Sequence, residues 1–188
     1  MKKILTLMCM LTAILTACNG KSQSTGTAGE TRTKILIAYF SCTGHTKQAA
    51  ETIARITKGD LYAITPAEAY TAADLDWRND KSRSSREMGN PASRPGLAGK
   101  KVDIASYDIV YLGYPIWWGI CPRIINTFLE TYDFKGKKVI PFATSGSSSI
   151  AQSESELHKL YKEIRWGKGL LMNNVSRQEV QNWVNGEK

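Results

Sequence analysis

Histidine and cysteine are scarce in this chain of 188 residues, which contains two of the first and four of the second. So few cysteines cannot form the disulfide framework that holds many small secreted proteins together. The chain also lacks a Walker lysine pattern and a G-x-G-x-x-G fingerprint, so neither ATP nor a dinucleotide is the expected ligand. Hydrophobic residues make up 42% of the sequence, which is enough for a folded core.

The first residues have the form of a bacterial export signal. Lys2 and Lys3 precede an apolar stretch at 4–14, which is too short to span a bilayer as a stable helix. The sequence continues as Leu-Thr-Ala-Cys, ending at Cys18. This ending resembles the lipobox of bacterial lipoproteins, in which the cysteine is acylated and becomes the first residue. We therefore expect residues 1–17 to be a signal peptide and Cys18 to be lipidated, with an ordinary secretory signal as the alternative.

Export determines the expected location of the protein. Residues 18–33 are rich in glycine, serine and threonine, as is typical of a flexible tether, and they lead to a domain at 34–188. No twin-arginine signal is present, so we expect the chain to cross the membrane unfolded and to face the periplasm as an anchored lipoprotein. Asn19 differs from the acidic residue that retains some lipoproteins at the inner membrane, which favours the outer membrane.

From residue 34 onward, short apolar runs alternate with amphipathic stretches. The runs are often β-branched and apolar at consecutive positions, as in strands buried on both faces of a parallel sheet. They lie at residues 35–40, 61–64, 109–114, 139–143 and 170–172. Five strands alternating with helices predict an α/β fold, namely an open, doubly wound, five-stranded parallel sheet with helices on both faces. Ligands of such sheets bind at the carboxyl ends of the strands.

Helices are predicted from apolar residues spaced i, i+3, i+4, i+7 and from capping boxes. Ser153 and Glu156 have capping-box spacing ahead of one such stretch, and Ser176 and Glu179 have it ahead of another, near the C-terminus. The helical spacing occurs at residues 50–57, 125–132 and 157–164.

The connection between the second and third strands, residues 66–106, is long and basic. Residues 72–88 within it could form a helix. The formal net charge is +8, or +6 once Lys2 and Lys3 leave with the signal peptide, and residues 78–101 contain seven basic and two acidic side chains. Two interpretations are open: a solvated charged surface, or contact with anionic lipid or an acidic redox partner beside the lipid anchor. Nucleic-acid binding does not suit an exported lipoprotein.

Three polar or aromatic segments follow predicted strands. Residues 41–46 (Ser-Cys-Thr-Gly-His-Thr) combine hydroxyls, a turning glycine and a helix start, which favour a monophosphate; a hydroxyl-rich cap without a ligand is the alternative. Residues 114–119 contain two adjacent tryptophans, which can stack on a flat ring or close the end of the sheet. Residues 144–149 can offer N–H groups and hydroxyls to the polar edge of a ring. Because all three segments follow strands, we expect them on one rim of the sheet, where together they predict a pocket for a planar ligand that carries a phosphate.

The three segments, in this order, resemble the loops of the flavodoxins, small proteins that bind flavin mononucleotide (FMN). The first is similar to the family's S/T-x-T-G-N-T phosphate loop, with matches at Ser41, Thr43, Gly44 and Thr46. The resemblance extends from about residue 34 to the C-terminus and includes the long connection. The binding residues that it implies are Ser41, Cys42, Thr43, Gly44, His45, Thr46, Pro115, Ile116, Trp117, Trp118, Gly119, Thr144, Ser145, Gly146 and Ser147.

Four residues with chemically active side chains need separate interpretation. His45 stands where the family usually has asparagine, and its imidazole can donate to a phosphate, more strongly when protonated. His158 lies beside the apolar stripe of a predicted helix and is expected to be a solvated surface residue. Cys42 and Cys121 follow strand ends that should be neighbours. The alternatives are a disulfide, a reactive Cys42 thiol, and two small residues near the phosphate, and we favour the last. No catalytic acid–base pair and no metal site is expected.

The resemblance implies an electron-transfer function, in which the flavin performs the redox chemistry and the protein tunes it. The partner would be a redox protein or a small-molecule electron donor or acceptor. One alternative is an FMN-dependent NAD(P)H:quinone or nitro-compound reductase of the same fold, and another is a flavin-free binding module. Flavodoxins that replace ferredoxin are usually acidic, whereas this chain is basic, so we expect a less negative potential and a different partner.

Overall fold

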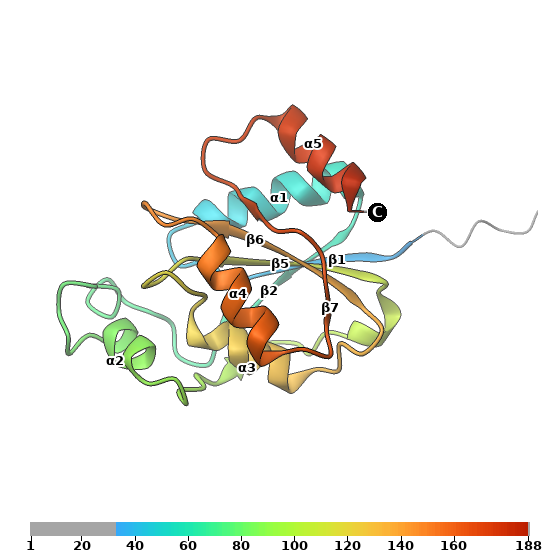
Figure 1. The fold of residues 1–188 in the computed structure, drawn as a ribbon. Helices are drawn as coiled ribbons and strands as arrows, with labels where there is room; N and C mark the ends of the chain where they lie inside the picture. Colours follow the sequence, from blue (N-terminus) through green and yellow to red (C-terminus); the bar gives the residue numbers. More distant parts are fainter. Residues whose placement is uncertain (1–32, 188) are drawn as a thin grey trace, which may run out of the picture. The chain divides into compact units, whose positions relative to one another are not determined.

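A parallel sheet forms the centre of the part of the chain that the structure, a computed structural model, describes, residues 33–187 (Figure 1). Its strands follow the order β2-β1-β5-β6, and two short strands, β7 and β8, each pair with β6. The predicted α/β class, with a parallel sheet of about five strands flanked by helices, is confirmed. The strands of this sheet are β1 (Ile35–Tyr39), β2 (Asp60–Ala63), β5 (Ile109–Pro115), β6 (Lys138–Thr144), β7 (Arg165–Trp166) and β8 (Leu170–Leu171).

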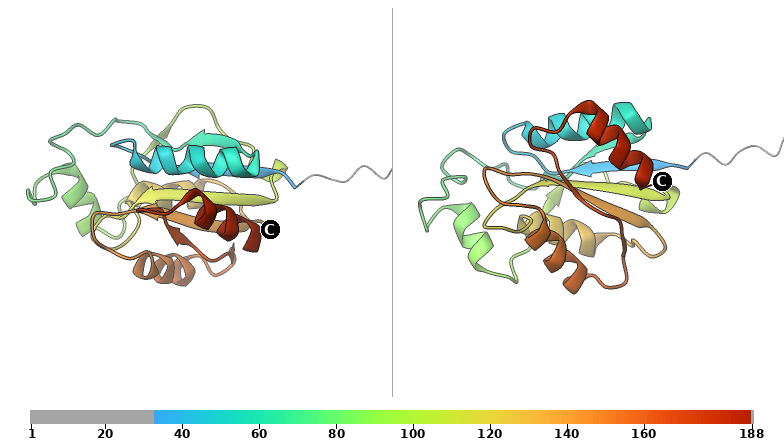
Figure 2. Two further views of the ribbon diagram at one scale, coloured as in Figure 1. Left: turned by 90° about the horizontal axis from the view of Figure 1, so that it is seen from above. Right: turned by 45° about the horizontal axis from the view of Figure 1, so that its top comes forward.

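Helices cover both faces of the sheet, as the view in the right half of Figure 2 shows. On the face covered by α1 and α5, Ile53 and Val184 pack into a cluster with Ile37 of the sheet. On the face covered by α3 and α4, Phe128 and Leu157 belong to a second cluster. Both clusters are almost entirely buried. The bounds are α1 (His45–Thr57), α3 (Arg123–Thr131), α4 (Ala151–Leu160) and α5 (Arg177–Gly186).

The outer edge of the sheet is split at Pro141, in the middle of β6. The N–H of Gly167 donates to the carbonyl of Val139 (2.8 Å), and the N–H of Met172 donates to that of Ala143 (2.7 Å), so alternate residues of β6 face outward. Pro141 is one of these outward residues and has no N–H to donate. The predicted fifth strand is β8, and β7, which the sequence analysis did not predict, pairs with β6 ahead of the proline.

The long connection between β2 and β5 has secondary structure of its own. Two short antiparallel strands close it at its base. A short helix lies between these strands in the sequence and is placed beyond the carboxyl edge of the sheet (Figure 1). A single 3-10 turn then leads back to β5. These elements are β3 (Thr65–Pro66), α2 (Arg83–Gly89), β4 (Leu97–Ala98) and η1 (Ile104–Ser106).

The helix predicted over 72–88 is wrong for the residues before 83. In that stretch, carboxylate and amide oxygens accept hydrogen bonds from nearby backbone N–H groups. Asp74 accepts from residue 71, Asp76 from residue 78 and Asn79 from residue 81. These local bonds stabilise turns in place of a helix. As a result, Leu75 and Trp77 lie on a turn-rich segment and not on a helix face.

The two predicted capping boxes have different outcomes. At α5, Ser176 Oγ accepts from the N–H of Glu179 (3.2 Å), and the Glu179 carboxylate accepts from the N–H of Ser176 (2.8 Å), as predicted. The box predicted from Ser153 and Glu156 is wrong. Ser153 is buried inside α4 and donates to the hydroxyl of Tyr114 on β5 (3.0 Å), so its hydroxyl fixes the helix to the sheet instead of capping it.

The sequence predictions for the N-terminal region concern residues that the structure does not describe. They are the signal peptide at 1–17, the lipidation of Cys18 and, except for residue 33, the tether at 18–33. They stay predictions from the sequence. Within residues 33–187, no helix combines the length and the apolar character that crossing a bilayer requires.

Candidate functional site

The three predicted loops meet at the carboxyl edge of the sheet, where they follow the adjacent strands β1, β5 and β6. A hydrogen bond of 2.8 Å between the hydroxyls of Thr46 and Thr144 joins the first loop to the third. Another of 2.8 Å, from the N–H of Ile116 to the carbonyl of Thr144, joins the second to the third. The predicted site residues therefore share one rim. The first, second and third loops are residues 41–46, 115–119 and 144–147.

The first loop leaves the start of α1 open to an anion. Gly44 is the N-cap of α1 and has φ +91°, a left-handed conformation that glycine adopts without strain. Ser41 Oγ accepts a hydrogen bond from the N–H of Gly44 (3.1 Å) and so supports the turn. α1 has no side-chain cap and no acidic residue in its first turn. The positive end of the helix dipole and the N–H groups of that turn are thus available to a phosphate or a similar anion.

The second loop is a tight turn that separates the roles of its two tryptophans. Trp117 and Ile120 exchange backbone hydrogen bonds of 2.9 and 3.1 Å, and the residues between them, Trp118 and Gly119, have φ +49° and +84°. Two positive φ angles define a type I′ turn. For a tryptophan this conformation costs about 1–3 kcal/mol. The turn holds the Trp118 side chain outward, where 49% of the residue is exposed.

Trp117, by contrast, is anchored in an aromatic cluster. Its ring meets the rings of Phe40 and Tyr70 edge to face, with centroids 5.7 and 5.4 Å apart. The guanidinium of Arg83 lies 4.1 Å from the centre of the Tyr70 ring and pairs with Glu87 at 2.7 Å. The Glu87 carboxylate also accepts a hydrogen bond from the Tyr70 hydroxyl. Through this cluster, α2 fixes the position of the second loop.

Serine and asparagine side chains organise the third loop. The Oγ of Ser145 accepts from the N–H groups of Ser147 (3.2 Å) and Ser148 (2.8 Å). The N–H of Ser145 donates to Oδ1 of Asn173 (2.9 Å), and the amide of Asn173 donates back to the Ser145 carbonyl. The loop is therefore held in a defined shape by a residue that follows β8. The sequence analysis missed Asn173, since nothing in its local pattern shows that it meets residue 145.

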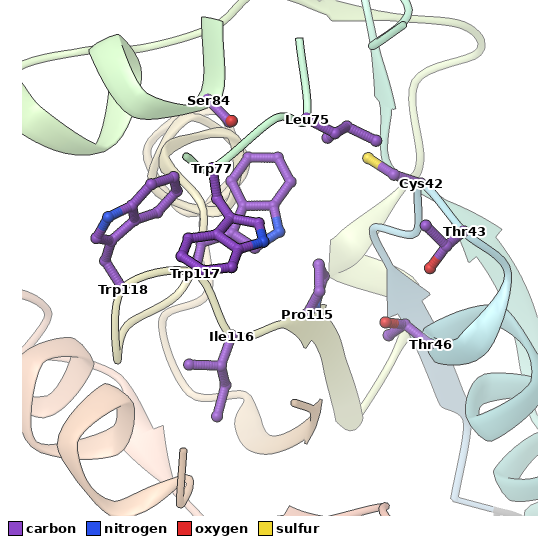
Figure 3. Close-up of a pocket in the computed structure, with 10 residues that line it drawn as sticks. All are labelled: Cys42, Thr43, Thr46, Leu75, Trp77, Ser84, Pro115, Ile116, Trp117 and Trp118. Carbon is purple, nitrogen blue, oxygen red and sulfur yellow. The ribbon is translucent and has the colours of Figure 1, made fainter. Parts of the chain in front are cut away.

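An aromatic cavity of about 450 Å³ opens between the first loop, the second loop and the long connection (Figure 3). Leu75, Trp77 and Ser84 of the connection line it, and the sequence analysis missed all three. Trp77 is 63% exposed, with the Arg78 guanidinium 4.7 Å from its ring centre. A lone tryptophan among charged residues was the one available signal. The lining residues are Cys42, Thr43, Thr46, Leu75, Trp77, Ser84, Pro115, Ile116, Trp117 and Trp118.

A polar cavity of about 660 Å³ lies between the first turns of α1, the second and third loops and the start of α5. It shares Thr43 and residues 115–117 with the aromatic cavity, so the two cavities adjoin. Gln48, Thr52 and Asn174 are further lining residues that the sequence analysis missed. The full set is Thr43, His45, Gln48, Ala49, Thr52, Pro115, Ile116, Trp117, Thr144, Ser145, Gly146, Met172, Asn173, Asn174, Val175 and Val180.

Four of the fifteen predicted site residues line neither cavity. Ser41 and Gly44 shape the turn before α1, and Ser147 takes part in the third loop through its N–H. Gly119 completes the type I′ turn and packs against Gln152 of α4, whose amide oxygen would lie 2.7 Å from an added Cβ. The other eleven residues border one cavity or both. Ser41, Gly44, Gly119 and Ser147 therefore support the site through its backbone.

The two cysteines of the described chain are free thiols, so they do not form the disulfide that was one alternative. Cys42 is exposed, yet desolvation raises the pKa of its thiol to about 11, with Arg83 lowering and Glu87 raising it. Burial raises the pKa of Cys121 to about 12. Neither thiol is activated for nucleophilic attack. Within residues 33–187, no cluster of three or more histidine, cysteine or acidic side chains could hold a metal ion.

A family model described as flavodoxin matches residues 34–187. The chain belongs to the flavodoxin family. A candidate flavoprotein from Bacteroides uniformis is 55% identical, with a TM-score of 0.79 over 81% of this chain and 98% of that one. A candidate flavoprotein from Bacteroides eggerthii is 51% identical, with a TM-score of 0.80 over 82% and 97% of the two chains. No functionally curated protein matches the chain.

The flavodoxin fold also relates this chain to a flavoprotein of Lactobacillus acidophilus that was crystallised in complex with FMN. That protein is 23% identical, with a TM-score of 0.67 over 81% of this chain and 99% of its own. At this identity the likeness concerns the fold. The family match reaches from residue 34, just before β1, to the end of α5 and thus includes all three loops.

Proposed function

We propose that this protein binds FMN non-covalently and transfers electrons between redox partners. Membership of the flavodoxin family and the FMN-bound neighbour of the same fold support FMN as the cofactor. The observation in this chain that carries the proposal is the junction of two unlike surfaces at Thr43. An uncapped helix start lies on one side of this residue, and a cavity lined by three tryptophans lies on the other.

The residues present fit each part of FMN. A phosphate suits the N–H groups at the start of α1, which have neither a side-chain cap nor an acidic neighbour in the first turn. An added Cβ at Gly44 would meet nothing within 4 Å, so the loop is open at this point. The flat ring system suits the aromatic cavity, where Trp77, Trp117 and Trp118 offer faces for stacking. The hydroxyls of Thr144 and Ser145 on the same rim suit its polar edge.

Bound flavin supplies transfer of one or two electrons. The chain contributes binding, orientation and control of the surroundings. Because no carboxylate or basic side chain lines the aromatic cavity, this side of the site disfavours extra negative charge. Trp77 and Trp118 line the cavity and are 63% and 49% exposed, which leaves a short route to an external partner.

Reconstitution tests this function directly. We expect the purified protein to bind one FMN per chain, with perturbed flavin absorbance and quenched tryptophan fluorescence. The reduced complex should then pass its electrons to an added one-electron acceptor protein, with buffer containing free FMN as the control. Protein that stays colourless after incubation with FMN and gel filtration would instead support a flavin-free binding module.

The half-exposed indoles of Trp77 and Trp118 favour a second candidate function, reduction of a small planar substrate. Exposed aromatic faces beside a flavin site can stack on a quinone or a nitroaromatic compound. NAD(P)H oxidation by the FMN-loaded protein separates the two functions. A fast rate that depends on added quinone supports the reductase, whereas a rate no faster than that of free FMN supports the electron carrier.

We propose that a lipid on Cys18 anchors the mature protein to the periplasmic side of a bacterial membrane, and we favour the outer membrane. The support is the sequence of residues 1–18. Within the basic segment at 78–101, which could add a membrane contact, Arg83 and Arg94 are paired with Glu87 and Glu130. Mass spectrometry of the mature N-terminus tests the anchor, because an unmodified N-terminus elsewhere than at Cys18 would contradict it.

A further inference from the structure

The proposed site has a single ionisable side chain on its polar side. Among the described residues that line the polar cavity, only His45 has an ionisable side chain. In the aromatic cavity the only ionisable lining residue is Cys42, and its thiol, with a pKa of about 11, is neutral there. If a phosphate binds in the polar cavity, the imidazole of His45 is the one lining group that can give it a formal positive charge.

The elements around His45 bring no other charged group into the cavity lining. Residues 115–120, 144–150 and 172–176 contain no ionisable side chain. On α1, Lys47, Glu51 and Arg55 line neither cavity, and the same is true of Arg177 and Glu179 at the start of α5. Across the aromatic cavity, Arg83 and Glu87 are paired with each other. His45 is thus the one ionisable side chain in the lining of the polar cavity.

We propose that protonated His45 pairs with the phosphate of FMN and selects FMN over riboflavin, which lacks that group. The inference rests on the proposed function and names a specificity-determining residue for it. His45 is the first residue of α1, directly after Gly44, and its side chain is exposed in the polar cavity. A phosphate monoester carries a charge of about −1.5 to −2 at pH 7. The helix start offers only about half a positive charge, so the protonated imidazole supplies more of the positive charge that faces the phosphate.

The pH dependence follows from this pairing. A bound phosphate dianion favours the protonated imidazole, so binding takes up protons near neutral pH. Histidine loses its charge between pH 5 and 8. The affinity for FMN is therefore expected to fall from about pH 6.5 to about pH 8.5, where the phosphate, whose second pKa is about 6, is already mostly a dianion. Riboflavin has no phosphate, and its affinity is expected to stay constant.

The experiment measures dissociation constants of FMN and riboflavin by flavin fluorescence at about pH 6.5 and about pH 8.5. Three proteins are compared: the wild type, His45→Asn and His158→Asn. Asparagine keeps a hydrogen-bond donor without a titratable charge. His158 is the matched control, because it is the other histidine of the chain, is exposed on α4 and lines neither cavity.

In the wild type and in His158→Asn, we expect FMN to bind about fivefold more weakly at the higher pH, the factor that corresponds to a strong exposed ion pair. Riboflavin with all three proteins, and FMN with His45→Asn, should change by less than about twofold. Equal pH profiles for FMN in the wild type and His45→Asn would overturn the inference while leaving FMN binding intact. A wild-type protein that binds neither flavin would instead refute the proposed function. Because FMN and riboflavin are also compared on the wild type alone, the test holds even if a variant fails to fold.

Discussion

The two adjoining cavities differ in the part of the chain that builds them. The polar cavity is made by the first turns of α1, by the segments at the ends of β5, β6 and β8 and by the start of α5, and its lining is rich in hydroxyl and amide groups. The aromatic cavity borrows one wall from the long connection, which brings Leu75, Trp77 and Ser84 to the rim. A parallel sheet collects the ends of its strands at one edge whatever their sequence. The connection is not constrained in this way, so the position of its wall depends on its own tertiary contacts.

This difference assigns separate tasks to the two sides. If the aromatic cavity holds the flavin ring, changes there should affect FMN and riboflavin equally. Changes at the start of α1, where the phosphate is proposed to bind, should affect FMN alone, because only FMN carries the phosphate. Comparing the two ligands therefore separates effects on the ring from effects on the phosphate.

The largest effect is expected for the reactivity of Cys42, which lines only the aromatic cavity. Desolvation raises its pKa to about 11, so the reactive thiolate is depleted at pH 8 and appears only as the pH approaches that value. Alkylation at pH 8 should be on the order of a hundredfold slower than for a free cysteine, whose pKa is about 8.5. Mass spectrometry of the iodoacetamide-treated protein measures the rate.

Riboflavin and FMN should both protect Cys42 from alkylation. Cys121, which is buried away from both cavities, should stay unmodified whether or not a flavin is added. Equal rates at Cys42 with and without saturating flavin would place the ring outside the aromatic cavity.

Gly44→Val should weaken FMN binding by about tenfold or more. A β-branched residue at φ +91° is strained by about 1–3 kcal/mol, and relief of that strain would move the N–H groups at the start of α1. Gly136→Val is the control, because Gly136 also has a left-handed φ (+76°) and an added Cβ there also meets nothing within 4 Å, but it lines neither cavity. Calorimetric titration measures both. If Gly44→Val lowered the affinity for riboflavin as much as the affinity for FMN, residue 44 would not act through the phosphate.

Trp77→Ala and Trp118→Ala should each weaken the binding of FMN and of riboflavin by the same factor, about two- to tenfold. The factor corresponds to about 0.5–1.5 kcal/mol for an aromatic pair. Leu160→Ala is a matched control, since Leu160 is also a half-exposed apolar residue but lines neither cavity. Fluorescence titrations with both ligands check this. Unchanged affinities in both tryptophan variants would show that the exposed indoles serve a partner and not the flavin.

Thr46→Val should lower the free energy of unfolding by about 1 kcal/mol. The change removes the hydrogen bond between the buried Thr46 hydroxyl and Thr144, which joins the first and third loops. Thr131→Val, at an exposed hydroxyl on α3, should change stability by less than about 0.5 kcal/mol. Urea denaturation measures both, and equal midpoints for the two variants would show that the bond between the loops contributes nothing.

The sequence predicted the sheet and its rim well because the signals are local. Consecutive apolar residues such as those of β5 indicate a buried parallel strand, and a glycine between hydroxyls indicates a turn into a helix. The outer edge was harder, since the effect of Pro141 depends on which side of β6 it faces. Ser153 was misread because a serine at capping distance can also point into the core and bond Tyr114.

The long connection escaped sequence analysis for a physical reason. Its helix is only seven residues long and its turns are stabilised by Asp74, Asp76 and Asn79, so it has no sustained periodicity. Its position depends on tertiary contacts, above all the packing of Tyr70 against Trp117. Trp77 could therefore be recognised as a tryptophan in a polar segment, but it could not be placed beside the second loop.

The most direct test of the account is a titration of the purified protein with FMN, followed at once by flavin absorbance and tryptophan fluorescence. Binding at the junction of the two cavities predicts one FMN per chain, a perturbed flavin spectrum and strong quenching, because three of the five tryptophans line the aromatic cavity. An unchanged flavin spectrum and unquenched fluorescence, even at ligand concentrations far above micromolar, would contradict it.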